Sequence, residues 1–123
     1  MRDDSSETAG CDAHGHVTHE HEPRPSWVIN RAVAMFKAMG DPARLRLLEI
    51  LFDGRHCVSE LSAESGDAMS TVSQRLKVLV GAGLITRKRE GKHIYYALAD
   101  AHVAGLILNA LEHAGEDQQL TGG

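Results

Sequence analysis

Four potential metal ligands occur in two pairs near the C-terminus of the chain. Asp100 and His102 form the first pair, and His113 and Glu116 form the second, whose members lie three residues apart and therefore on one face of a helix. In a helix that rises about 1.5 Å per residue, Asp100 and His113 are about 20 Å apart, too far for one metal ion. An antiparallel partner helix in a twofold dimer would bring the two pairs together and create two equivalent sites.

The donor set of such a site indicates which metal it would bind. Two imidazole nitrogens and two carboxylates in tetrahedral geometry suit Zn²⁺, whereas Co²⁺ would fit less tightly, and Ni²⁺ and Cd²⁺ are the further alternatives. A purely structural role stays open for each residue. Asp100 is a good helix N-cap, and the helix dipole favours acidic residues near a helix start and histidines near its end.

A basic segment lies between residues 68 and 98. It contains six basic residues and one acidic residue, a local net charge of +5, whereas residues 26–123 as a whole are neutral. This asymmetry is typical of a surface that contacts phosphate, although residues 87–92 taken alone would also fit a solvated hairpin. Short hydrogen-bonding side chains at residues 70–74 are of the kind that read base edges. The predicted DNA-binding residues are Ser70, Thr71, Ser73, Gln74, Arg75, Lys77, Arg87, Lys88, Arg89 and Lys92.

Apolar spacing predicts a mainly α fold with one β-hairpin. Helices are expected over residues 26–39, from Asp41-Pro42 to Gly54, from a cap near Ser59 to Gly66, from about Ser70 to Gly81, and from Asp100 to about Ala114. Two β-favouring runs, residues 84–89 and 93–98, flank a glycine turn and predict the hairpin. Two short helices joined by a tight turn and followed by a hairpin indicate a winged helix-turn-helix, in which the fourth helix reads DNA and the hairpin is the wing.

Composition limits the class of protein. The chain has 123 residues, of which 42% are hydrophobic and 24% charged, and this fits one globular domain. Residues 1–25 carry a net charge of −4 and four of the eight histidines, so we expect a disordered arm there, a domain over residues 26–117 and a flexible tail over 118–123. No apolar stretch is long enough for a membrane span and no signal peptide is recognisable, which predicts a cytoplasmic protein.

Five motifs follow one another along the domain. They are residues 38–48 (AMGDPARLRLL), 57–61 (CVSEL), 70–79 (STVSQRLKVL), 83–85 (GLI) and 91–96 (GKHIYY). With these motifs, residues 32–116 resemble the ArsR–SmtB family of winged helix-turn-helix metal-sensing repressors. The resemblance implies a homodimer built on the first and last helices, which binds an inverted repeat in double-stranded operator DNA and releases it when inducer binds. It also implies that the two ligand pairs of the last helix form the zinc site of SmtB-like sensors.

The resemblance further implies a second, softer metal site between the arm and the DNA-binding helices. Its ligands would be Cys11, His14 or His16, Cys57 and Glu60. Thiolate ligands would also admit Cd²⁺ or Pb²⁺. Position 59 is a serine, so the Cys-Val-Cys pattern of arsenic- and cadmium-responsive relatives is absent. The alternative for Cys57 is a small buried hydrophobic side chain.

These observations predict a zinc-responsive transcriptional repressor. The alternative is a winged-helix repressor that senses another metal, Ni/Co or Cd/Pb, or no metal. An enzyme is not expected, because four filled ligands on an interface helix leave no coordination position for a substrate. The chain also lacks a nucleophile motif and a phosphate-binding loop, so neither a small organic substrate nor a membrane is expected as a partner.

Overall fold

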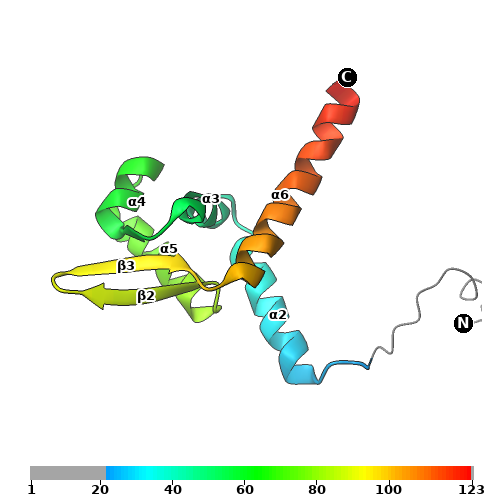
Figure 1. Ribbon diagram of the computed structural model, residues 1–123, viewed down its shortest axis with the longest axis horizontal. Coiled ribbons are helices and arrows are strands. Elements are labelled where there is room, and N and C mark those ends of the chain that lie inside the picture. Colours follow the sequence, from blue (N-terminus) through cyan, green and yellow to red (C-terminus); the bar gives the residue numbers. More distant parts are fainter. Residues whose placement is uncertain (1–21, 123) are drawn as a thin grey trace, which may run out of the picture.

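The structure, a computed structural model, describes residues 22–122, with side chains as far as Glu116. Its elements follow the order predicted for a winged helix-turn-helix (Figure 1). They are α2 Ser26–Met39, α3 Pro42–Ile50, the 3-10 helix η1 Leu51–Asp53, β1 His56–Cys57, α4 Val58–Ser65, α5 Met69–Gly81, β2 Ile85–Glu90, β3 His93–Leu98 and α6 Ala101–Gly122. Most of the arm predicted at residues 1–25 lies outside the described residues.

The joint between α2 and α3 forms as the Asp41-Pro42 pair predicts. The Asp41 carboxylate accepts a hydrogen bond of 3.0 Å from the backbone N–H of Arg44 and so caps α3. Pro42 occupies the first helical position, where a backbone N–H would have no partner in the helix. The Arg44 guanidinium donates to the carbonyl of Ala38 at 2.7 Å and to that of Lys37 at 3.2 Å, which satisfies the end of α2.

Helices α4 and α5 form the predicted helix-turn-helix. The N-cap of α4 is Cys57 and not the predicted Ser59, because β1 runs directly into the helix. Gly66 ends α4 with a φ of 81°, a left-handed conformation that favours glycine. Helix α5 then begins at Met69, one residue before the predicted start at Ser70.

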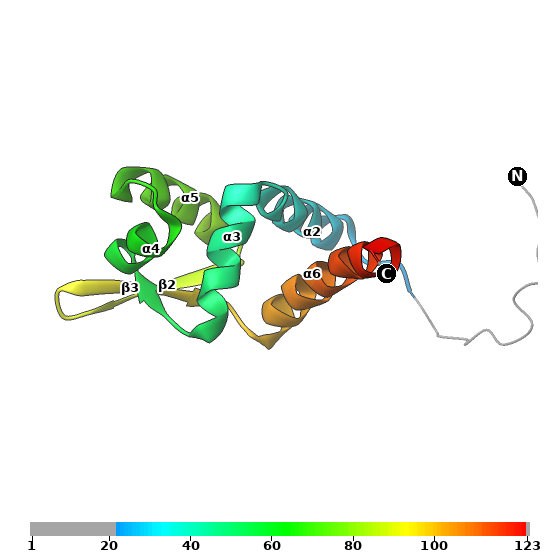
Figure 2. The same cartoon turned by 90° about the horizontal axis from the view of Figure 1, so that it is seen from above.

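The sheet has three antiparallel strands in the order β1-β3-β2. Strands β2 and β3 form the predicted hairpin, in which Glu90 pairs with His93 and Gly91 adopts a φ of 65° in the turn. Strand β1 is an additional strand, and its His56 pairs with Tyr96. Two residues are too few to show the alternation that predicts a strand. The hairpin extends from the body on the side opposite α6 (Figures 1 and 2).

The core is aliphatic, as the aromatic content of 4% predicts. The largest side chains that are almost fully buried are Leu47, Leu48, Leu61, Val72, Leu76, Leu79, Leu84 and Ile107. They come from α3, α4, α5 and α6 and from the residue before β2. Val72, Leu76 and Leu79 recur at helical spacing, so one face of α5 is fixed in the core and its opposite face is presented outward.

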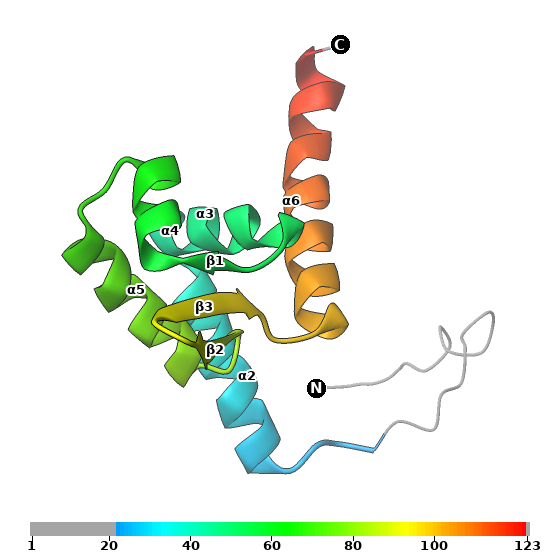
Figure 3. The same ribbon diagram turned by 60° about the vertical axis from the view of Figure 1, so that its left-hand side comes forward.

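Helix α6 is longer than predicted. It continues to Gly122, whereas its apolar periodicity predicted an end near Ala114. Val103 and Ile107 are buried against the core, while the C-terminal half of the helix protrudes from the body (Figures 1 and 3). The flexibility predicted for residues 118–123 stays a prediction. Within residues 22–122, no helix is both long and apolar enough to cross a membrane.

Candidate nucleic-acid interface and metal-ligand pairs

The outward face of α5 carries the side chains predicted to read bases. The exposed polar residues of its first half are Ser70, Thr71, Ser73 and Gln74. Arg75 was also predicted to contact DNA, but its guanidinium binds the Asp67 carboxylate at 2.7 Å and its side chain is 26% exposed. Within this chain Arg75 therefore stabilises the turn between α4 and α5, and its contact with DNA stays a prediction.

The cations of the wing divide between its two faces. Successive side chains of a strand point to opposite faces, so Arg87 and Arg89 share one face of β2 and Lys88 lies on the other. Lys88 Nζ is 3.8 Å from a Glu90 carboxylate oxygen, which weakens its attraction for phosphate. Lys92 is exposed in the turn. The three cations of β2, predicted together, therefore do not all lie on one face of the wing, and their contacts with DNA stay a prediction.

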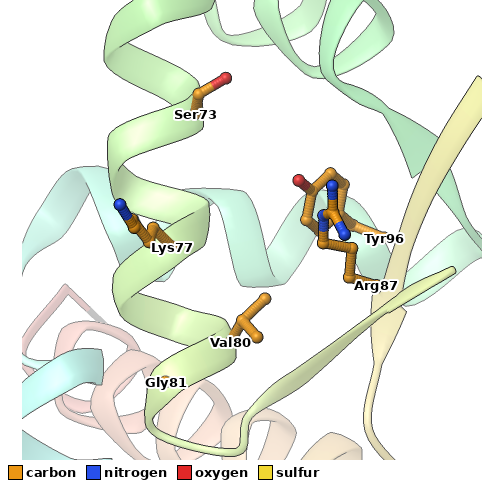
Figure 4. A pocket seen from close by; sticks show the side chains of 6 residues that line it. All are labelled: Ser73, Lys77, Val80, Gly81, Arg87 and Tyr96. Carbon is orange, nitrogen blue, oxygen red and sulfur yellow. The ribbon is translucent and has the colours of Figure 1, made fainter.

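A groove of about 500 Å³ separates α5 from the wing (Figure 4). Its lining residues are Ser73, Lys77, Val80, Gly81, Arg87 and Tyr96. Lys77 comes from α5 and Arg87 from β2, so two of the predicted DNA-binding cations line one concave surface. Tyr96 was not predicted as a site residue, because an aromatic residue in a strand indicates a place in the core, and Tyr96 is indeed largely buried.

The two metal-ligand pairs lie at the start of α6 and in its protruding half. The Asp100 carboxylate accepts a hydrogen bond of 3.0 Å from the backbone N–H of Val103, as a helix cap does. His102 Nδ1 is 3.9 Å from the same carboxylate oxygen. His113 Nδ1 is 3.4 Å from Glu116 Oε1. The members of each pair are therefore neighbours.

Each predicted ligand pair contributes two side chains, fewer than a four-coordinate metal site needs. The imidazoles are highly exposed, His102 by 98% and His113 by 84%, so both are accessible to an ion. In the part of the chain that the structure describes, no group of three His, Cys, Asp or Glu side chains could hold a metal. That a second molecule supplies the remaining ligands, as the spacing along the helix predicts, stays a prediction.

Two residues of the second predicted metal site, Cys57 and Glu60, are joined by a hydrogen bond. Glu60 Oε1 accepts a hydrogen bond of 2.9 Å from the backbone N–H of Cys57, and this bond lowers the pKa of the Glu60 carboxyl. Cys57 Sγ lies 3.1 Å from Ser59 Oγ. Cys11, His14 and His16, the other ligands predicted for this site, lie outside the described residues.

Arg55, which was not predicted as a site residue, connects the segment before β1 with the two strands of the wing. Its guanidinium carbon lies 4.0 Å from the centre of the Tyr95 ring, and its Nη1 is 2.7 Å from Glu90 Oε2. The hydrogen bond from Arg55 lowers the pKa of the Glu90 carboxyl. Arg55 is far from Glu90 and Tyr95 in sequence, so no local pattern could have revealed these contacts. They support the face of the wing that carries Lys88, opposite the groove.

Comparisons with known proteins agree with this architecture. Residues 41–87 match the family described as bacterial regulatory protein, arsR family. The chain is 37% identical over 95 residues to the HTH-type transcriptional repressor SmtB of Mycobacterium tuberculosis (strain ATCC 25618 / H37Rv), a match that covers 77% of this chain and 70% of that protein. This chain belongs to the ArsR family. The resemblance to ArsR–SmtB proteins inferred from the five motifs is thereby confirmed.

Two further comparisons extend along most of the chain. The HTH-type transcriptional regulator NmtR of Mycobacterium tuberculosis is 35% identical over 92 residues, covering 75% of this chain and 77% of that protein. The homodimeric winged helix-turn-helix DNA-binding domain of Mb0332 from Mycobacterium bovis, a possible ArsR-family regulator, has a TM-score of 0.72 and 27% identity and covers 80% of this chain and 92% of that one. The α6 ligand pairs lie beyond the residues that match the family itself, which end at residue 87.

Proposed function

We propose that this ArsR-family protein is a zinc-responsive transcriptional repressor, which binds an inverted repeat in operator DNA as a homodimer and releases it when Zn²⁺ binds. The observation that carries the proposal is the pair of exposed His–carboxylate half-sites on α6, in a chain whose α5 and wing present cations. The proposed role is regulatory and not enzymatic, because four side-chain ligands leave no open coordination position for a substrate.

Uncovered apolar side chains support the homodimer. Helix α2 exposes Trp27 by 62% and Phe36 by 59%, and α6 exposes Leu108 by 46%. Phe36 also lines an apolar cavity with Leu106 and Ala110, where α2 and α6 meet. Exposed apolar patches of this kind mark protein–protein contacts. Both helices lie at the end of the molecule away from the wing, so a partner there would leave the DNA-binding face free (Figure 2).

The positions of the predicted ligands around the axis of α6 support a metal site shared between subunits. His113 follows His102 by 11 residues, which at about 100° per residue is within about 20° of three full turns. Glu116 stands one turn beyond His113, and Asp100 directly precedes the helix. An antiparallel α6 would therefore present His113 and Glu116 to His102 along one face, with Asp100 beside His102 at the start of the helix. Bound there, Zn²⁺ would supply a strong bond between the two subunits.

The proposed release depends on the distance between the two α5 helices of the dimer. Val103 and Ile107 anchor α6 in the same core as Leu76 and Leu79 of α5. Fixing α6 against its partner therefore fixes the separation of the two α5 helices. That separation must match half-sites about one helical turn of DNA apart, and a dimer held at another separation binds weakly. By thermodynamic reciprocity, operator must weaken zinc binding by the same factor.

A repressor that senses another metal, or no metal, is the second candidate. Asp100 favours the option without a metal, because its carboxylate accepts a hydrogen bond from the N–H of Val103 and so already has a structural role. Ni²⁺ or Co²⁺ would use the same imidazoles, whereas Cd²⁺ or Pb²⁺ would favour the softer thiolate of Cys57. Adding each ion singly to the protein–DNA complex and measuring release distinguishes these alternatives.

Gln74→Ala and Arg87→Ala are expected to affect DNA binding differently. Gln74 is exposed on α5 and carries an amide that can pair with a base edge, so its loss should cost about 1–3 kcal/mol on the cognate duplex alone. Arg87 should contact phosphate, so its loss should weaken all duplexes alike and lower the salt slope by about one. Fluorescence anisotropy would compare a duplex selected by the wild-type protein from a random pool with an unrelated duplex. Equal losses on both duplexes for Gln74→Ala would remove this residue from base reading.

A further inference from the structure

Tyr96 buries its ring beside the groove between α5 and the wing, but its hydroxyl has no partner there. The residue is 8% exposed, and none of the side-chain hydrogen bonds among residues 22–116 involves its hydroxyl. Figure 4 shows the hydroxyl turned toward α5, the helix that carries Ser73 and Lys77. The hydroxyl therefore faces the open groove and is free to donate a hydrogen bond to a ligand from outside the chain.

The groove around this hydroxyl is positively charged. Lys77 on α5 and Arg87 on β2 both line it, with the Lys77 ammonium turned away from Tyr96 in Figure 4, and none of the ion pairs among residues 22–116 involves either side chain. Arg87 is the direct cross-strand neighbour of Tyr96, so the two side chains leave the same face of the sheet. Ser73 lies one helical turn before Lys77 and adds a second hydroxyl. The lining offers two cations and two hydroxyls and contains no carboxylate.

We propose that this groove binds a phosphodiester group of the DNA backbone, with the Tyr96 hydroxyl donating a hydrogen bond to a phosphate oxygen between Lys77 and Arg87. The inference rests on the proposed DNA binding. A helix in the major groove is bordered on both sides by sugar–phosphate backbone, so one strand passes between α5 and the wing, over this cavity. Tyr96 thereby fixes how α5 sits in the major groove without reading any base.

Tyr96→Phe tests the proposal because it removes the hydroxyl and keeps the ring in the core. The full-length protein would be titrated by fluorescence anisotropy against the duplex selected by the wild type and against an unrelated duplex, at several salt concentrations. We expect a loss of about tenfold on both duplexes, as for one hydrogen bond to a charged group, with an unchanged salt slope. Lys77→Met should also weaken both duplexes and lower the salt slope by about one.

Tyr95→Phe is the matched control, because Tyr95 precedes Tyr96 in β3 and lies on the opposite face of the wing. It should leave both affinities unchanged, and the melting temperature of each variant would show that the fold is retained.

Unchanged affinity in a folded Tyr96→Phe, or a loss confined to the selected duplex, overturns the proposal while the proposed function stands. Inorganic phosphate that binds the free protein through Tyr96 but leaves DNA affinity unchanged at fixed ionic strength would assign the groove to a free anion instead. Wild-type protein that binds no duplex would overturn both.

Discussion

His113→Gln is expected to produce a protein that still binds operator DNA but no longer releases it when zinc is added. The substitution removes one imidazole nitrogen from each of the two proposed sites of the dimer. His113 is 84% exposed, so the fold should not change. In the wild type, zinc should weaken DNA binding by a factor of about 5 to 150, the usual range of allosteric coupling. In the variant, anisotropy titrations should give the same affinity with and without zinc.

Glu116→Gln is the matched control for this prediction. Glu116 lies one turn further along the same exposed face of α6, 3.4 Å from His113. Its substitution leaves both imidazoles of each site, so release should persist and require more zinc. Wild-type protein that keeps its DNA at saturating zinc would contradict the mechanism, and so would a His113→Gln protein that releases DNA normally.

Phe36→Glu is expected to dissociate the homodimer and to abolish tight operator binding. Phe36 is 59% exposed on α2 beside the apolar cavity shared with α6, so a carboxylate there would have to be buried in the proposed subunit contact. Within one chain the new side chain stays in water, and the monomer should remain folded. Losing the second α5 of a bivalent protein should lower affinity by about 100-fold or more. Sedimentation velocity and anisotropy would measure the two effects.

Phe52→Glu provides the control for a new charge on an exposed aromatic position. Phe52 lies in η1, outside α2 and α6, and is 38% exposed. It should leave the dimer and its DNA affinity intact. A Phe36→Glu protein that sediments as a dimer, or that binds the selected duplex as tightly as the wild type, would exclude this surface from the subunit contact.

Local sequence signals correctly predicted helix ends that are marked by a capping residue, a proline or a glycine. Asp41 and Pro42 start α3, and Gly66 ends α4, because a cap, a fixed φ and a left-handed residue act within a few positions of the chain. Strand β1 could not be predicted in this way. Its two residues become a strand through pairing with β3, and that pairing depends on tertiary structure. The end of α6 was predicted too early, because its apolar spacing stops where it leaves the core.

In the candidate site, too, some features could be predicted from the sequence and others depend on tertiary packing. The exposure of the ligand pairs on α6 and of Gln74 on α5 follows from which side of each helix is apolar, and this is visible in the sequence. The ion pair that draws Arg75 to Asp67 and the groove that joins Lys77 to Arg87 depend on how α4, α5 and β2 pack together. Tyr96 could not be identified from sequence, because burial of its ring and exposure of its hydroxyl to the groove become apparent only in three dimensions.

Subunit mixing tests most directly whether the zinc sites are shared between two chains. His102→Ala and His113→Ala homodimers each lack one ligand in both sites. In a mixed dimer the two missing ligands fall in the same site, and the other site keeps all four natural ligands. After subunit exchange between the two variant proteins, we predict about one tightly bound zinc ion per mixed dimer and recovery of zinc-induced DNA release by part of the population. If wild-type dimers bind zinc and exchange occurs, but mixing restores neither zinc binding nor release, the shared site on α6 is contradicted.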